Sequence, residues 1–279
     1  MLGRRVTDLF LWLVVFAGIG PAAAAAAQTA DMVLIPAGTY QPLFSVSDAD
    51  PKGLMARASL SGKPAGKKSQ TEVAAFYLDR LPVTNGDFVE FTRQHPNWNK
   101  NSVKRLFAEK QYLAHWPDPA GAQFEPLRRQ AVVNVSWFAA KAYCQWRDTR
   151  LPTVDEWEYV ASRDVAVGRD RMILDWYARP TSNSLPEAGH SFQGALGVWD
   201  MHGVVWEWVA DFNSALVTGE SRGDTGLERG LFCAAGSIGS TRPDDYSTFM
   251  RYALRNSLKA NYTLPNLGFR CARSVGDTP

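Results

Sequence analysis

The side chains of this sequence with the most distinctive chemistry are three cysteines and four histidines. Thiolates bind soft metals or pair into disulfides, and imidazoles are common metal ligands. The cysteines form no C-x-x-C redox pair, and the histidines form no H-x-x-x-H pair of the kind that holds zinc on one helix. A three-histidine iron site built from distant loops stays open, although no spacing points to it; His202 is interpreted as structural. The histidines are His95, His115, His190 and His202.

A second group of candidate residues lies in the C-terminal third of the chain. Glu207 stands between two tryptophans, where it is either a buried structural carboxylate or an acid–base group. The Asp-Asp-Tyr segment at 244–246 could bind a metal or polar ligand, or could form a solvated loop. Arg251 and Arg255 carry the planar guanidinium that clamps carboxylate or phosphate, and they could equally brace the surrounding loops.

Composition and missing motifs exclude several classes of function. The net charge is +2 without a basic block, which argues against nucleic acid or an anionic membrane surface as partner. The sequence contains no glycine-rich phosphate loop and no nucleophile-elbow motif. The length is enough for one domain with a sizeable core.

The N-terminus has the order of a secretory signal peptide. Arg4 and Arg5 precede the apolar run Leu9–Gly20, and small residues follow at Ala22–Ala27. We expect residues 1–27 to be cleaved, which predicts a periplasmic protein without stable membrane association. The alternative is an uncleaved anchor, for which the apolar run is short.

Local patterns predict the elements that must position the candidate residues. Met32–Tyr40 is expected to be a strand entering a turn, and Val73–Leu78 a second strand. Residues 45–71 are expected to form an exposed loop, and residues 95–130 an irregular segment. From about residue 165 onward helical periodicity disappears, which predicts short strands and loops.

Three helix starts are indicated by capping residues. Thr84 with Asp87, Ser136, and Thr153 with Glu156 each precede a segment with buried aromatic positions. Helices at the front and a loop-rich back half predict an α+β domain stabilised by aromatic packing.

Six sequence blocks, in series, resemble the formylglycine-generating enzyme (sulfatase-modifying factor) superfamily. The resemblance implies an irregular variant of the C-type lectin fold with little regular secondary structure, spanning residues 31–273 and followed by a tail at 274–279. The blocks are Met32–Tyr40, Leu81–Phe91, Val133–Trp146, Arg150–Tyr159, Gly197–Trp208 and Asn266–Ala272.

Two departures from the family pattern bear on chemistry. In the formylglycine-generating enzyme, two cysteines bind copper and engage the substrate cysteine. Here the first matching position is Ser240, and the segment Pro243–Met250 that covers the second contains no cysteine. The usual formylglycine mechanism is therefore not expected. Val204 replaces a calcium-binding asparagine, and its side chain offers no oxygen ligand.

The resemblance also implies a disulfide between Cys144 and Cys271. It would close a loop of 127 residues and contribute about 4–5 kcal/mol on the chain-entropy model. Cys233 is then left over, on the expected strand leading to Ser237. It is either an inert buried thiol or a reactive or metal-binding one.

The segments Gly219–Ser237 and Tyr252–Arg273 resemble denitrification-associated (NirV-type) members, which predicts two alternative functions. The first is an accessory or maturation oxidoreductase that supports a periplasmic respiratory enzyme such as nitrite reductase. The second is a non-catalytic, lectin-like binding module. Copper, iron or calcium are conceivable cofactors, and the sequence requires none. The candidate catalytic residues are Ser237, Ser240, Cys233 and Arg251; the candidate ligand-binding residues are Trp206, Glu207, Trp208, Asp244, Asp245, Tyr246 and Arg255.

Overall fold

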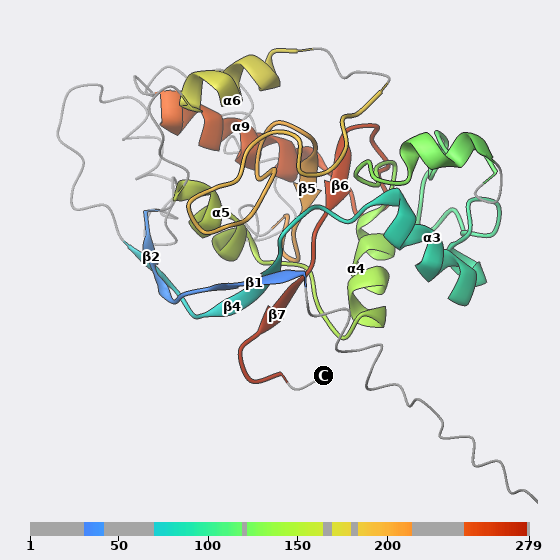
Figure 1. Cartoon of the computed structure of the whole chain (residues 1–279), viewed down its shortest axis with the longest axis horizontal. Coiled ribbons are helices and arrows are strands. Elements are labelled where there is room, and N and C mark those ends of the chain that lie inside the picture. Colours follow the sequence, from blue (N-terminus) through green and yellow to red (C-terminus); the bar gives the residue numbers. More distant parts are fainter. Residues whose placement is uncertain are drawn as a thin grey trace, which may run out of the picture. The chain divides into compact units, whose positions relative to one another are not determined.

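The computed structural model describes residues 31–41, 70–118, 122–163, 169–179, 184–213 and 243–277. The described residues belong to one compact unit that begins at Asp31. Its elements are short and mixed, with helices packed around three small sheets (Figure 1). None of the helices in these ranges has the length and hydropathy needed to cross a bilayer.

A three-stranded antiparallel sheet joins the two ends of the described chain. Its strand order is β1 (Met32–Ile35), β4 (Phe76–Asp79) and β7 (Ala272–Ser274). Ile35 pairs with Phe76, and Leu78 pairs with Ala272. These four side chains are all buried, so the register is fixed by the apolar face of the sheet.

The expected strand Val73–Leu78 is two strands, which corrects the sequence interpretation. β3 (Thr71–Val73) pairs with β2 (Gly38–Tyr40), whereas β4 pairs with β1. The break falls at residues 74–75, where the chain changes from one sheet to the other. Glycine suits position 38 because a Cβ there would collide with the Tyr159 hydroxyl. That hydroxyl is held in place by donating to the Pro36 carbonyl.

The three predicted helix starts are confirmed. α3 (Asn85–Gln94) begins at the Thr84–Asp87 capping box, and α4 (Trp137–Trp146) begins after Ser136. α5 (Val154–Ser162) begins at the Thr153–Glu156 capping box. The segment between α3 and α4 contains the short 3-10 helices η2 (Pro96–Trp98) and η3 (Ala122–Leu127).

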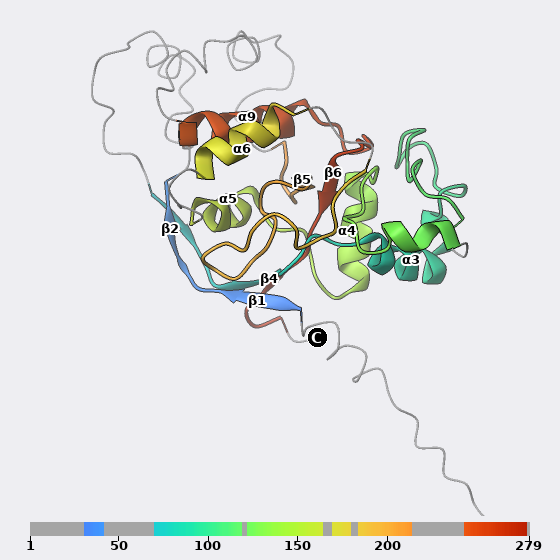
Figure 2. The ribbon, with the colours of Figure 1, turned by 45° about the horizontal axis from the view of Figure 1, so that its top comes forward.

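Two further helices follow residue 165, where the sequence predicted none. α6 (Arg169–Tyr177) and α9 (Pro243–Ser257) lie side by side in both views of the ribbon (Figures 1 and 2). The buried positions of α9 include Arg251, Tyr252 and Arg255. A buried face made of charged and aromatic side chains lacks the apolar periodicity by which an amphipathic helix is recognised.

A parallel pair of strands lies at the centre of the fold. β5 (Trp206–Trp208) pairs with β6 (Leu267–Phe269), with Glu207 opposite Gly268. A Cβ on Gly268 would lie 2.6 Å from the Val132 carbonyl oxygen, so glycine is needed for this close approach.

The core beside this pair is rich in stacked and edge-to-face aromatic rings. Phe88 lies 5.6 Å from Tyr143 and 6.1 Å from Phe269 between ring centroids, distances typical of aromatic packing. Next to it, a disulfide joins Cys144 of α4 to Cys271, between β6 and β7, with Cα atoms 5.6 Å apart. It is the pair that the family resemblance implied.

Candidate functional site

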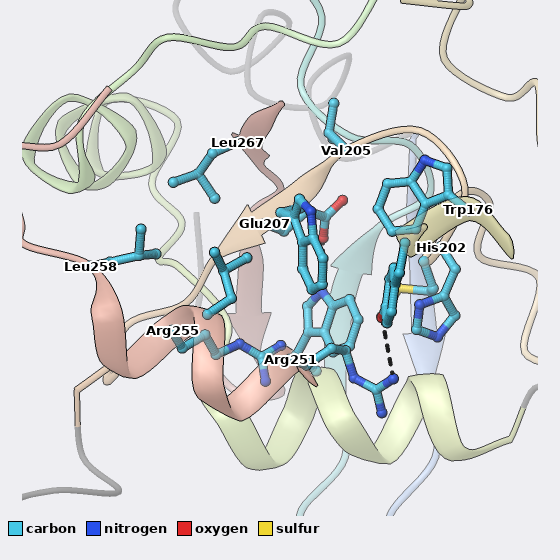
Figure 3. A pocket seen from close by; sticks show the side chains of 13 residues that line it. Trp176, His202, Val205, Glu207, Arg251, Arg255, Leu258 and Leu267 are labelled. Carbon is cyan, nitrogen blue, oxygen red and sulfur yellow. Dashed lines mark hydrogen bonds between the residues drawn. The ribbon is translucent and has the colours of Figure 1, made fainter. Parts of the chain in front are cut away.

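A narrow pocket lies where α6 and α9 meet β5 (Figure 3). It contains about 310 Å³ of empty space, counting its open mouth. Its lining includes four residues nominated from the sequence: Trp206, Glu207, Arg251 and Arg255. Trp157, Trp176, Tyr177 and His202 complete its aromatic walls.

The two arginines of α9 bind a carboxylate of the protein itself. Glu158 accepts from Arg251 Nη2 at 2.7 Å and from Arg255 Nη1 at 2.5 Å, and all three side chains are buried. Burial alone would raise the pKa of the Glu158 carboxyl. The charges of Arg251 and Arg255 outweigh burial and lower this pKa to about 2. The guanidinium groups therefore brace α9 against α5, as one of the two sequence hypotheses proposed.

Glu207 is held in a second buried ion pair. Its carboxylate accepts from Arg270 Nη2 at 2.7 Å and Nε at 2.8 Å, and from Trp157 Nε1 at 2.8 Å. Both charged side chains of the pair are fully buried. This environment agrees with a structural carboxylate, because every contact described for Glu207 satisfies its charge within the protein.

The pocket is closed by aromatic rings from α6. Tyr177 stacks on Trp206 with ring centroids 4.4 Å apart and planes 21° apart, and Trp176 lies 5.5 Å from the same indole. Behind them, Arg255 lies 4.7 Å and Arg251 5.5 Å from the Trp157 ring centroid. The pocket therefore has aromatic walls, with two arginines that are ion-paired to Glu158 lying against the Trp157 ring.

His202 lies on the same side of the pocket as Trp176 (Figure 3). Its ring meets Trp157 edge to face at 5.5 Å. Burial, reinforced by the charge of Arg251, lowers the pKa of His202 well below its ordinary value. Its Nδ1 atom is buried without a hydrogen-bond partner among the described residues. A buried polar atom of this kind is uncommon in folded proteins.

A second buried imidazole, His115, belongs to a polar network away from the pocket. Its Nε2 lies 3.3 Å from Asn85 Oδ1, and its Nδ1 lies 3.2 Å from Asn134 Nδ2. A neutral ring satisfies both contacts, donating through Nε2 and accepting through Nδ1. Burial, assisted by the charge of Lys100, lowers the pKa of His115 to about 4.

Several nominated residues do not contribute to the pocket. Trp208 is completely buried and donates to the Val135 carbonyl oxygen, so its expected role in ligand binding is corrected to one in the core. Cys233, Ser237 and Ser240 lie outside the described residues. The solvated loop considered for Asp244, Asp245 and Tyr246 is instead the start of α9.

The pocket also contains residues that sequence reasoning did not nominate. Trp176 and Tyr177 carried a visible signal as adjacent aromatics, but the helix that presents them was not predicted. Glu158 carried none, because its two partners lie 93 and 97 positions away along the chain.

The side chains present do not fit the copper and calcium sites of the family that the sequence resembles. No group of three or more His, Cys, Asp or Glu able to hold a metal occurs within the ranges that the structure describes. Val204 packs in an apolar cluster with Ala131, Val133 and Val205, which does not fit a calcium ligand set. Serine at 240, with no cysteine in 243–250, does not fit a copper thiolate pair.

A family model and several known proteins match much of the chain. The family described as sulfatase-modifying factor enzyme 1-like domain matches residues 19–275. The Bos taurus protein named inactive C-alpha-formylglycine-generating enzyme 2 is 27% identical over 300 residues, covering 90% of this chain and 91% of the relative. The formylglycine-generating enzyme of Streptomyces coelicolor is 33% identical over 186 residues, covering 58% and 59%. Among solved structures, PvdO from Pseudomonas aeruginosa has a TM-score of 0.46 at 20% identity, covering 87% of this chain and 94% of that one.

Proposed function

This chain belongs to the sulfatase-modifying factor enzyme 1-like family, and from that premise we propose that it is a binding module that does not generate formylglycine. Its fold is the irregular α+β fold of that family. The proposed ligand site is the pocket between α6, α9 and β5.

Loss of the copper ligands supports the first half of the proposal. Formylglycine generation in this family depends on two cysteines, and hydroxyl groups cannot replace thiolates as ligands for Cu(I). Ser240 stands at the first position, and no cysteine covers the second. The Bos taurus relative is itself named inactive.

The binding function is supported by one observation: the ionised side chains at the pocket are paired with one another within the protein. Arg251 and Arg255 are paired with Glu158, and Glu207 is paired with Arg270. These ion pairs join the elements around the pocket. The surfaces left for contact with a ligand are the rings of Trp176, Tyr177 and Trp206. Aromatic walls with a few placed polar groups are typical of sites that recognise small ligands or single side chains.

A direct assay tests the absence of formylglycine chemistry. The purified full chain is supplied with copper and a sulfatase peptide that carries the target cysteine, and the peptide is analysed by mass spectrometry. We expect no aldehyde product, with the Streptomyces coelicolor enzyme as the active control. Conversion at a rate comparable to that control would overturn this half of the proposal.

A thermal-shift screen tests the binding function. Small molecules that raise the Tm of the full chain are re-tested on Trp206→Ala and on Trp146→Ala, a partly buried tryptophan of α4. A ligand at the pocket stabilises by mass action, so its shift should vanish in Trp206→Ala and persist in Trp146→Ala. Shifts that survive in both variants would place binding elsewhere and contradict the proposed site.

A second candidate function is an exported accessory or maturation oxidoreductase acting beside periplasmic nitrite reductase. The segments Gly219–Ser237 and Tyr252–Arg273 favour it, because they resemble denitrification-associated members of the family. Cys233 adds a thiol, since it is the one cysteine outside the disulfide.

Metal analysis separates this candidate from the binding module. Mature protein is purified from the periplasm without chelators or a His tag. Stoichiometric copper or iron that is lost in Cys233→Ser would favour the oxidoreductase. Unchanged nitrite reductase activity and copper loading in a deletion strain would contradict the denitrification role.

A further inference from the structure

Tyr177 occupies the pocket in the manner of a ligand. Its ring lies flat on the Trp206 indole at 4.4 Å, and its hydroxyl accepts from Arg251 Nη1 at 3.5 Å, the contact dashed in Figure 3. The 310 Å³ of the pocket counts its open mouth and the gaps between side chains; with Tyr177 and Trp176 in place, the part that a water molecule can enter holds about one water. A bound ring must therefore take the place of one of these side chains.

The hydrogen bond that holds the Tyr177 hydroxyl is weak compared with the hydrogen bonds around it. Its hydroxyl bond to Arg251 is at the outer limit for a hydrogen bond, whereas Arg251 donates to Glu158 at 2.7 to 3.2 Å. Departure of Tyr177 thus leaves the Arg251–Glu158 ion pair intact. Among the described side chains of α6, only Ile173 is buried, and the helix lies against α9 in both ribbon views (Figures 1 and 2).

His202 supplies a polar contact that Tyr177 does not use. The side chain is 2% exposed, and its Nδ1 has no hydrogen-bond partner among the described residues. A neutral imidazole nitrogen accepts or donates one hydrogen bond according to its tautomer. A ligand with a hydroxyl or N–H at the edge of its ring would satisfy this atom.

The charges at the pocket favour a neutral ring over a cation. Four aromatic side chains around one space also describe a cage for an ammonium group. Here, however, Arg251 and Arg255 already lie over Trp157, at 5.5 and 4.7 Å from its centroid. Arg251 and Arg255 share the single charge of Glu158, and Arg270 neutralises the Glu207 carboxylate, so these groups leave a net positive charge that opposes the entry of another cation.

We propose that this pocket binds a neutral phenol or indole ring, which displaces Tyr177 from the face of Trp206 and hydrogen-bonds to His202 Nδ1. The proposal rests on the proposed function, in which the same pocket is the ligand site. The shared chemistry is a flat ring with a polar edge, carried either by a free small molecule or by an aromatic side chain of a peptide.

Binding of p-cresol and indole to the full chain tests the proposal, followed by tryptophan fluorescence and ligand-observed NMR. Tyr177→Ala removes the internal competitor, so p-cresol should bind about tenfold more tightly than to wild type. Tyr262→Ala, a partly buried tyrosine outside the pocket lining, is the matched control and should bind as wild type does. Trp206→Ala should abolish binding.

Two comparisons test the polar edge. Toluene, which lacks the hydroxyl, should bind Tyr177→Ala about fivefold more weakly than p-cresol. His202→Phe combined with Tyr177→Ala should remove this preference. An unchanged preference would overturn the assignment of His202. Tighter binding of N-acetyltyrosinamide than of p-cresol would identify a peptide side chain as the source, and the reverse order a free small molecule.

The proposal is wrong if no phenol or indole probe binds a folded Tyr177→Ala protein, or if tetramethylammonium binds better than p-cresol. Circular dichroism establishes folding, and Tyr177→Leu replaces the alanine variant if that one does not fold. Failure here leaves the proposed function standing, because the formylglycine assay and the Trp206-dependent thermal shifts test it independently.

Discussion

At the scale of the single residue, Glu158 is a buried carboxylate that holds two arginines, Arg251 and Arg255. Glu158→Gln keeps the shape but removes the negative charge of Glu158 from beside two buried guanidinium groups. Breaking a buried pair in this way typically costs about 3–5 kcal/mol. We expect a loss of this size in the free energy of unfolding, measured by urea denaturation.

The matched control for Glu158 is an exposed pair of the same chemistry. Glu125 bonds Arg128 at 2.9 Å on the surface, where ion pairs contribute little. Glu125→Gln should leave the urea midpoint almost unchanged. Equal losses in the two variants would show that Glu158 is not the electrostatic anchor of α9.

His115 makes the stability depend on pH. Its pKa is about 4 in the folded protein against 6.5 as the ordinary value. Between these values the unfolded chain binds a proton that the folded protein does not, so stability falls as the pH drops from 6.5 to 4. The loss is about 3 kcal/mol for this shift.

Substitution isolates the contribution of His115. His115→Gln removes one titrating group and should reduce the slope of unfolding free energy against pH between 6.5 and 4, a window in which buried His202 also contributes. His190→Gln, at an exposed position, should keep the slope of the wild type. An unaltered slope in His115→Gln would assign the pH dependence to another group, of which buried His202 is the first to test.

At the scale of elements, the α5 capping box should contribute measurably to stability. Thr153 Oγ1 accepts from the Glu156 backbone N–H at 3.1 Å, and the Glu156 carboxylate accepts from the Thr153 backbone N–H at 2.8 Å. Thr153→Ala should cost about 1 kcal/mol in urea denaturation. Thr153→Ser keeps the hydroxyl and should recover most of it; a serine variant as unstable as the alanine one would contradict the capping role.

The helices were predictable where their signals are local. Each capping side chain lies within three residues of the backbone N–H that it accepts from, as at Thr84, Ser136 and Thr153. α9 also has local signals, with Pro243 at its start and two acidic residues directly after it. The resemblance of this segment to the copper-cysteine region of the family favours a loop instead, which hides these helix signals.

The candidate site was less predictable than the helices because its partners are distant in sequence. Trp206, Glu207, Arg251 and Arg255 were nominated and do line one pocket. Their pairing with Glu158 and Arg270 depends on how α5, α9 and β6 pack. No periodicity or spacing in one sequence contains that information.

At the scale of the whole molecule, the disulfide predicts a thiol count. Three cysteines less the two in the Cys144–Cys271 bond leave one thiol, Cys233. Denatured but unreduced protein should therefore react with one equivalent of Ellman's reagent, and with three after reduction. Reduction should also cost about 2–5 kcal/mol of stability. A count of three before reduction would contradict the bond.

The position of β6 and β7 governs the order in which the molecule can be assembled during biosynthesis. Residues 267–274 complete two sheets, pair Arg270 with Glu207 and bring Cys271 to α4. They are translated after every other described element. The domain therefore cannot close until residues 267–274 have left the ribosome, and a stop codon before residue 267 would leave β4, β5 and Cys144 of α4 without these partners.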